Sequence, residues 1–369
     1  MPRERRGSGC GFVAAARRAA SVVLQLAIGG AVAGGVTSCG GNDGASRLVL
    51  YVSADDYVAR EVVRAFEEQT GIRVDLVGDT EVNKNTGLAN RIRAEASSPR
   101  ADVFWSSECF MMIQLAEEGL LEPFSHADVE SWPVNLRDAA RRWHGFAPRA
   151  RVIVYSTERV SREEAPRTWI HLTRERWRGR VVMADPRFGT TRGHLGALKV
   201  FFDGQLPGGY EAFLGNLAYN QVRLLTSGNA GVVQAVARGE ADVGMTDTDD
   251  VWAAQRNGAQ VDLVYPWHGE ENERGAGTLV IPNTVALIRG AKNHEQAGEF
   301  IRFLLSERVE RMLVESDSRN IPIRESVMKD YPQYAVPEPL RIDLKRVAEA
   351  MDGAVEAAMR ILGSGAGES

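Results

Sequence analysis

Oxygen-bearing side chains follow nearly every short apolar run of this 369-residue chain. The acids that we single out in such positions are Asp55, Asp56, Glu81, Glu108, Asp247 and Asp249. Carboxylates gathered in one concave site repel one another and need a cation to stay ionised together. Oxygen ligands suit hard cations such as Ca²⁺, Mg²⁺, Mn²⁺ or Fe³⁺ better than copper or zinc. The acids therefore predict a metal site, provided that the fold brings them together.

Hydroxyl and amide side chains form a second set, expected at helix starts. Its members are Thr190, Thr191 and Asn229, the last followed by Ala230. Free backbone N–H groups at helix starts bind anions. A metal with a companion anion would therefore use both sets, and so would a zwitterionic organic ligand. Helix capping is the alternative role, because Asp, Asn, Ser and Thr side chains accept the orphan N–H groups at helix starts.

The positions of both sets depend on an alternation of strands and helices. The apolar run 48–52 predicts a buried strand, and Val58 and Phe66 share one face of the helix expected after it, which stops at Gly71. Further strands that precede helices are expected at 102–105, 180–184, 222–226 and 242–245. The helix after the second of these is expected to begin near His194. This alternation predicts an α/β fold with mostly parallel sheets.

Two extended segments, at 146–155 and 277–288, predict strands that cross between two lobes. A cleft between the lobes would face the carboxyl ends of strands from both sheets, where open α/β sheets bind ligands. We therefore predict two α/β lobes joined by two crossing segments. The expected boundaries are 47–148 plus 277–330 for lobe one, 149–276 for lobe two and 331–369 for a C-terminal helical segment.

The first residues have the features of an export signal. Five arginines accompany an apolar run at 19–36, which ends in small residues before Cys39. Val-Thr-Ser-Cys resembles a bacterial lipobox, which implies a signal peptide at 1–38, a lipid on Cys39 and a polar tether at 39–46. An uncleaved anchor is the alternative, because roughly 18 apolar residues can just span a bilayer. Either alternative holds the chain at the membrane, on its periplasmic or extracellular face.

Charge and cysteine content exclude other classes of protein. The net charge is −5, and the first 38 residues hold five Arg and one Glu, so the remainder is more acidic than the whole. An acidic exterior argues against binding to nucleic acid. Of three cysteines, Cys10 precedes the expected cleavage site and Cys39 would carry lipid, which leaves Cys109 without a disulfide partner. We expect a monomer stabilised by apolar burial.

Catalytic patterns give one weak match. Asp247-x-Asp249-x-Val251 after a strand is similar to haloacid-dehalogenase-type phosphatases, in which the first Asp is the nucleophile and the second a general acid. The sequence downstream has no paired-acid metal motif in the right context. It has no Gly-x-Ser-x-Gly, no Walker A loop and no Cys–His nucleophile pair. We expect a binding protein rather than an enzyme, and a phosphatase is the remote alternative.

Short segments spread over the chain carry a family resemblance. Examples are Ala-Phe-Glu-Glu-Gln-Thr-Gly-Ile at 65–72 and Ala-Asp-Val-Phe-Trp-Ser-Ser-Glu at 101–108. The others are 118–124, 177–181, 188–191, 227–230, 237–240 and 281–283. From Arg47 to about Pro322 the chain resembles the ferric-iron class of bacterial periplasmic binding proteins, which have the type II two-lobed fold. The resemblance implies a solute-binding protein of an ABC importer that delivers its ligand to a membrane permease.

The resemblance also implies roles for individual residues. In iron-binding relatives a hydroxyl pair and an Asn-Ala pair hold a synergistic anion. The residues that match here are Thr190, Thr191, Asn229 and Ala230. Relatives use a glutamate after the strand at 102–105, and Ser107 and Glu108 both fit that position.

The ligand implied by the resemblance is a multivalent cation. Many relatives bind ferric iron through two adjacent tyrosines, where this chain has Thr248 and Asp249. Asp55 or Asp56 stands where relatives carry a ligand after the first strand, so the expected pocket is rich in acids. Iron or another hard cation, with a synergistic anion, is the leading ligand, and no other cofactor is required. The alternative is a small organic solute, such as a polyamine held by the carboxylates or a phosphorylated compound held at the helix starts.

Overall fold

The computed structural model describes residues 46–78, 84–125, 130, 134–317 and 319–363, within one compact unit that spans Gly44–Ser369. The expected signal peptide, the lipid site at Cys39 and Glu81 lie outside the described residues. Among the described helices, none combines the length and the apolar character needed to cross a bilayer.

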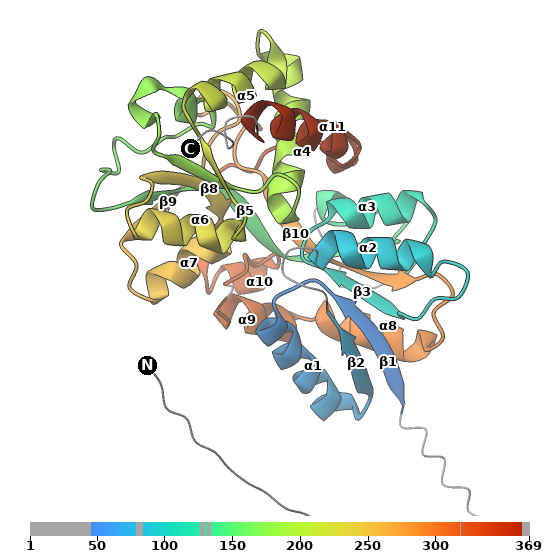
Figure 1. The fold of residues 1–369 in the computed structure, drawn as a ribbon. Helices are drawn as coiled ribbons and strands as arrows, with labels where there is room; N and C mark the ends of the chain where they lie inside the picture. The colour runs from blue at the N-terminus through green and yellow to red at the C-terminus, as the bar shows by residue number, and fades with distance from the viewer. Residues whose placement is uncertain (1–45, 79–83, 126–129, 131–133, 318, 364–369) are drawn as a thin grey trace, which may run out of the picture. The chain divides into compact units, whose positions relative to one another are not determined.

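Lobe one is built on a mixed sheet, not the mostly parallel one that was predicted, because β10 runs antiparallel to all its neighbours (Figure 1). Strand β1 pairs in parallel with β2 and β3, and β10 runs antiparallel to β3. The strands are β1 (Arg47–Val52), β2 (Arg73–Val77), β3 (Val103–Ser106), β4 (Leu121–Glu122) and β10 (Val280–Ile288). Leu48, Leu50 and Val52 pack on one face of β1 and Tyr51 packs on the other, as the alternation of side chains in a strand requires.

Strand β5 (His144–Ser156) passes from lobe one into lobe two. Its first half pairs with β10, and its second half pairs antiparallel with β8 and β9. The strands of lobe two are β6 (Val181–Ala184), β7 (Arg223–Leu225), β8 (Val243–Asp247) and β9 (Val261–Val264). The predicted fold class, two α/β lobes joined by crossing strands, is confirmed.

Helices cover both faces of each sheet (Figure 1). They are α1 (Asp56–Thr70), α2 (Lys84–Ala94), α3 (Phe110–Glu117), α4 (Gly189–Gln205), α5 (Gly209–Tyr219), α6 (Gly228–Ala237), α7 (Thr248–Arg256), α8 (His294–Leu304), α9 (Glu307–Glu315), α10 (Glu325–Met328) and α11 (Leu344–Leu362). Helix α1 ends as predicted at Gly71, whose φ of 73° suits glycine. Helix α4 begins at Gly189, before the expected start near His194, so Thr190 and Thr191 lie in its first turn. Their modest helix propensity hid this start, which packing in the tertiary structure decides.

The C-terminal part of the stretch 277–330, which is predicted to belong to lobe one, contacts both lobes. Leu313 and Ile323 pack in the core of lobe one. Val314, Ile321 and Val327 pack in a cluster with Val152 and Trp252 of lobe two. These side chains bury the apolar face of lobe two beside α7. The order and spacing of elements along the sequence do not reveal which lobe a C-terminal segment packs against.

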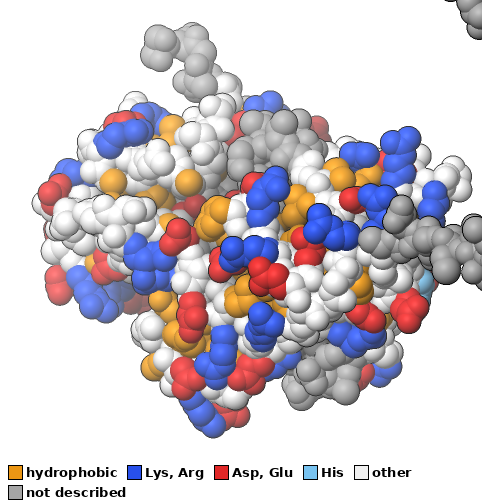
Figure 2. Space-filling view, turned by 90° about the horizontal axis from the view of Figure 1, so that it is seen from below, with side chains coloured by type: hydrophobic (Ala, Val, Ile, Leu, Met, Phe, Trp, Pro, Cys, Tyr) orange, Lys and Arg blue, Asp and Glu red, His pale blue; other side chains and the backbone are white. Residues whose placement is uncertain are grey.

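The surface is that of a solvated protein. Figure 2 shows acidic and basic side chains interspersed over one face of the molecule, with apolar side chains between them. Charges of both signs in alternation produce no single-sign field over this face.

Asp102, buried at the start of β3, ties together the edge of lobe one. One of its carboxylate oxygens accepts the backbone N–H of Val49 at 2.8 Å and the side-chain amide of Asn293 at 2.9 Å. The other accepts the backbone N–H groups of Lys292 and Asn293 at 3.0 and 2.9 Å. A single carboxylate therefore joins β1, β3 and the turn before α8.

Substitution Asp102→Ala is expected to lower the free energy of unfolding by about 3 kcal/mol, because buried N–H groups lose a charged acceptor. Urea denaturation followed by circular dichroism measures this change. The control is Asp75→Ala, which removes an exposed ion pair with Arg47 and should cost less than about 1 kcal/mol. Equal losses in the two variants would contradict the role given to Asp102.

Candidate functional site

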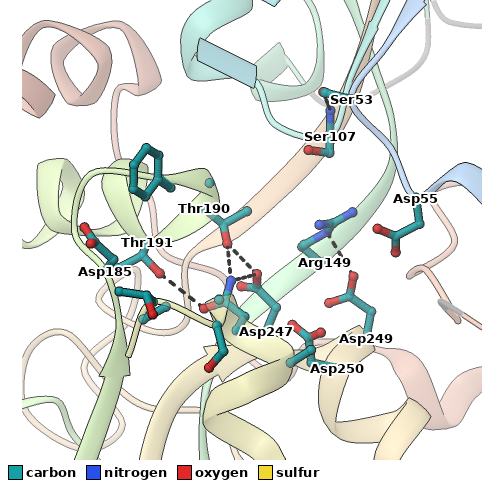
Figure 3. A pocket seen from close by; sticks show the side chains of 18 of the residues that line it. Ser53, Asp55, Ser107, Arg149, Asp185, Thr190, Thr191, Asp247, Asp249 and Asp250 are labelled. Carbon is teal, nitrogen blue, oxygen red and sulfur yellow. Dashed lines mark hydrogen bonds and ion pairs between the residues drawn. The ribbon is translucent and has the colours of Figure 1, made fainter. Parts of the chain in front are cut away.

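A cavity of about 370 Å³ lies between the two lobes. Lobe one contributes Ser53, Asp55 and Ser107, and strand β5 contributes Arg149 (Figure 3). Lobe two contributes Thr190, Thr191, Asn229, Ala230, Asp247, Asp249 and Asp250. These residues follow carboxyl ends of strands or open the helices after them, which is where α/β sheets place ligand sites.

Most of the predicted site residues line this one cavity, and two do not. Asp56 points to the solvent and pairs with Arg60 at 2.6 Å, so Asp55 is the acid of this pair that faces the cavity. Glu108 is buried behind the cavity wall, where its carboxylate accepts the backbone N–H groups of Phe110 and Met111 at the start of α3. Burial raises the pKa of Glu108 to about 7. Ser107, its neighbour, lines the cavity instead.

Asp247 uses both of its carboxylate oxygens inside the protein. Arg151 donates to one oxygen at 2.8 Å, and the other accepts from Asn229 at 2.8 Å and from the Thr190 hydroxyl. Arg151 and Asp247 are 0% and 1% exposed. Asp247, a predicted metal ligand, lines the cavity, and its contacts also position the starts of α4 and α6.

Two buried arginines on β5 were missed by the sequence analysis. Arg151 pairs with Asp247, and Arg149 approaches Asp249 with its Nε 3.3 Å from a carboxylate oxygen. The signal was present in the sequence. Two arginines spaced by two positions in an otherwise apolar strand point to the same face, and buried charges need partners of opposite sign.

Asp249 and Asp250 offer carboxylate oxygens that could bind a ligand in the cavity. One oxygen each from Asp247, Asp249 and Asp250 lie within 4.8 Å of one another. Asp249 is 9% exposed, and its buried Oδ1 has no hydrogen-bond partner among the described residues. Burial raises the pKa of Asp249 to about 6, with Arg149 opposing and Asp247 adding to the shift. Burial also raises the pKa of Asp250, and the charge on Asp249 adds to that effect. A cation beside both carboxylates would relieve this cost.

The helix starts around the cavity are not capped by their own side chains. Asp55, Ser227 and Asp247 occupy the N-cap positions of α1, α6 and α7, and none accepts a capping hydrogen bond. Asp55 and Asp247 therefore do not cap α1 and α7, whereas Glu108 does accept N–H groups at the start of α3. The first-turn N–H groups of a helix have no partner within the helix, so the starts of α4 and α6 at the cavity wall favour an anionic group.

Known proteins match this chain in sequence and in fold. A family model described as "Bacterial extracellular solute-binding protein" matches residues 98–340. The chain is 28% identical over 292 residues to iron uptake protein A1 of Synechocystis, an alignment that covers 75% of this chain and 78% of that protein.

Solved structures extend the match to the fold. A ferric binding protein from Campylobacter jejuni has a TM-score of 0.73 at 22% identity, over 85% of this chain and 99% of that one. A periplasmic binding protein of Actinobacillus pleuropneumoniae with fructose-6-phosphate bound has a TM-score of 0.68 at 18% identity, over 86% and 99%. At such identities the structures establish a shared fold.

Substitution Arg151→Met should lower the free energy of unfolding by about 3–5 kcal/mol, because it leaves the Asp247 carboxylate buried without a counter-ion. The double variant Arg151→Met, Asp247→Leu should recover part of this loss, because apolar residues can replace a buried ion pair at little cost. Urea denaturation measures both. Arg60→Met, which breaks the exposed ion pair with Asp56, is the control and should cost less than about 1 kcal/mol. A double variant no more stable than Arg151→Met would contradict the pairing.

Without ligand, the contribution of Asp249 to the free energy of unfolding should rise as the pH falls from about 7 to about 4. The pKa of Asp249 is raised to about 6 in the folded protein, whereas an unfolded Asp titrates near about 3.9. The folded state thus binds protons more tightly, and its stability is lost as the pH rises through the folded pKa. Chemical denaturation of the wild type and of Asp249→Asn at several pH values measures this. Parallel profiles for the two proteins would show that Asp249 is not the group responsible.

Proposed function

Because the chain belongs to the bacterial extracellular solute-binding proteins, we propose that it is the ligand-capturing component of an ABC importer. Members of this family bind solutes for transport and are not enzymes. The buried ion pair of Asp247 with Arg151 also leaves no free carboxylate at the position of a phosphatase nucleophile. A lipid on Cys39 would hold the monomeric protein at the outer face of the membrane, within reach of its permease.

The ligand that the cavity supports best is a multivalent cation such as iron. The observation that carries this proposal is the pair of neighbours Asp249, which is buried, and Asp250, which is partly buried; both have raised pKa values and face Asp55 across the cavity. Carboxylate oxygens are hard ligands suited to Fe³⁺ and similar cations. No tyrosine is among the described residues that line the cavity, so carboxylates would supply the charge that binds the metal.

A companion anion would occupy the opposite wall of the cavity. Thr190 and Thr191 in the first turn of α4 and Asn229 and Ala230 in the first turn of α6 offer backbone N–H groups there. Arg149 projects between this wall and the acids (Figure 3) and adds a positive charge. An anion would balance the charge of the metal and complete its coordination from this wall, where the carboxylates of Asp185 and Asp247 are each paired with an arginine.

Capture would proceed by closure of the lobes around the ligand. The crossing strands are irregular at the same level, where Ala147 of β5 has a φ of 44° and the register of β10 shifts between Ile281 and Asn283. Irregular backbone of this kind absorbs the dihedral changes of a hinge. A ligand that contacts both lobes stabilises the closed form, and this form is the one that the permease would recognise.

A small phosphorylated solute is the second candidate ligand. A cavity of about 370 Å³ falls in the range of small-molecule sites and exceeds the space that a metal ion needs. Arg149 disfavours a polyamine, because a cation repels a cation, and it favours a phosphate. The Actinobacillus protein of the same fold is solved with fructose-6-phosphate bound.

The two ligands are separated by thermal unfolding of protein stripped with EDTA. Ferric citrate should raise the melting temperature of the wild type, with a gain of about 2.7 kcal/mol at a hundredfold excess over Kd. Asp249→Asn, Asp250→Asn should abolish this response, whereas Asp75→Asn on the surface should retain it. Stabilisation by a sugar phosphate but not by ferric citrate would select the second candidate, and no response to either would reject both.

A further inference from the structure

The Arg151 guanidinium has a second edge, which the ligand cavity does not use. Its Nη1 donates to Asp247, Thr190 and Asn229. Its buried Nε and Nη2 have no hydrogen-bond partner among the described residues. A buried N–H group without an acceptor costs free energy, because it has lost its hydrogen bonds to water. This edge of Arg151 therefore needs acceptors that the described part of the chain does not supply.

The second edge of Arg151 faces the interior of lobe two. Side chains two positions apart in a strand point to the same face, and Ile153 of β5 packs in the apolar cluster that contains Trp169. On α4, His194 lies one turn after Thr190 and on the same side of the helix. Because Arg151 reaches Thr190 through Nη1, its remaining nitrogens lie toward His194. Burial lowers the pKa of His194, and the nearby charge of Arg151 lowers it further.

Two buried imidazoles lie in this part of lobe two. The ring centroids of His194 and His268 are 5.8 Å apart, and the Trp169 ring is 4.3 Å from that of His194. Both histidines are fully buried. Neither ring nitrogen of His194 has a hydrogen-bond partner among the residues that the structure describes, and the same holds for Nε2 of His268. Unmet polar groups from β5, α4 and the segment before β10 therefore gather in one place.

The protonation of the two imidazoles follows from their surroundings. Burial lowers the pKa of His268 to about 4, so both rings are neutral near neutral pH. Nδ1 of His268 lies 2.7 Å from the backbone oxygen of Gly277. This nitrogen therefore carries the proton, and Nε2 of the same ring is an acceptor. His194 offers one N–H group and one bare nitrogen.

The N–H groups of this cluster outnumber its acceptors. Arg151 offers the N–H groups of Nε and Nη2 and His194 adds another, whereas the acceptors are the bare nitrogens of His194 and His268. These groups therefore cannot all pair with one another. The charge of Arg151 is already balanced by Asp247, so the cluster has no net charge that would attract an anion. Water, which accepts and donates hydrogen bonds, is the neutral molecule that buried polar groups of this kind bind.

We propose that ordered water, bound between Arg151, His194 and His268, forms an internal site of lobe two. The water oxygen accepts from Nε and Nη2 of Arg151, and the water hydrogens reach the bare imidazole nitrogens. This holds the guanidinium in the orientation in which Nη1 reaches Asp247 and Thr190. His194 and His268 are thus positioning residues, which act on the ligand cavity through Arg151. Their effect on ligand binding rests on the function proposed above, whereas the water site itself does not.

A high-resolution crystal structure of the ligand-free protein tests the water site directly. We expect electron density for water within about 2.7–3.2 Å of Nε2 of His268 and of Nε or Nη2 of Arg151. Crystals soaked in bromide distinguish water from an anion, because bromide scatters anomalously, and we expect no anomalous signal in the site. A direct hydrogen bond from Arg151 to either histidine, apolar packing around its nitrogens, or a bromide signal there would overturn the proposal.

Two substitutions of His194 test the positioning role. His194→Phe removes a donor and an acceptor and places an apolar ring beside Arg151, so ferric citrate should bind about tenfold more weakly. His194→Gln keeps an amide donor and acceptor and should retain most of the affinity. Isothermal titration calorimetry measures both. In crystals of His194→Phe, Nη1 of Arg151 should lose a contact with Asp247 or Thr190, and unchanged contacts would contradict the positioning role.

Leu198→Ala is the matched control for stability. Leu198 is buried in the cluster of Trp169, one turn beyond His194 on α4. Its truncation should lower the melting temperature at least as much as His194→Phe does, yet leave the affinity for ferric citrate unchanged. Equal weakening of binding by the two variants, or wild-type affinity in His194→Phe, would refute the positioning role. If the wild type does not bind ferric citrate, the proposed ligand fails, and the two crystal structures still decide the water site and its effect on Arg151.

Discussion

The buried ion pair between Arg151 and Asp247 determines the geometry of the cavity. Transfer of two charges out of water costs several kcal/mol each, and attraction between them repays this only when the remaining hydrogen-bonding groups are satisfied. Here one Arg151 nitrogen, Nη1, also donates to Thr190 at 3.1 Å and to Asn229 at 3.2 Å, whereas its buried Nε and Nη2 have no hydrogen-bond partner among the described residues. The pair therefore joins the crossing strand β5, the end of β8 and the starts of α4 and α6. If any of these elements moved, one of the two charges would remain in the protein interior without its counter-ion.

This pair also explains why the cavity separates charge into two walls. With Asp247 neutralised by Arg151, negative charge remains on the side of Asp249, Asp250 and Asp55. The side formed by the first turns of α4 and α6 presents N–H groups and hydroxyls. Arg149 lies between the two walls and prevents the acids from acting as one cluster. A ligand that satisfies both walls carries positive and negative charge at separate points, and this requirement is met by a metal with an anion and by a zwitterion.

Sequence patterns predicted the architecture well because strand and helix periodicity is local. They also placed most of the site, because polar residues at strand ends converge in any sheet of this kind. It was harder to predict which of two adjacent residues faces the cavity. Asp55 and Asp56 are one position apart at a helix start, as are Ser107 and Glu108, so a small change in local backbone direction decides which side chain lines the cavity. Arg149 and Arg151 escaped notice because an apolar run hides charges whose partners are distant in sequence. The packing of α11 on both lobes was out of reach, since amphipathic periodicity reveals a buried face but not what covers it.

Helix α4 connects ligand binding to lobe contact within a single turn. Thr190 touches the cavity and Asp247, and Gly193, three residues later and so on a neighbouring part of the helix surface, packs against Phe110 of lobe one. Because a helix is rigid over such a distance, any shift that a ligand imposes on the start of α4 is transmitted directly to the interface between the lobes. The glycine allows the two helices to pack closely, since a side chain at this position would push them apart. Binding and closure are therefore mechanically coupled on this side of the cleft.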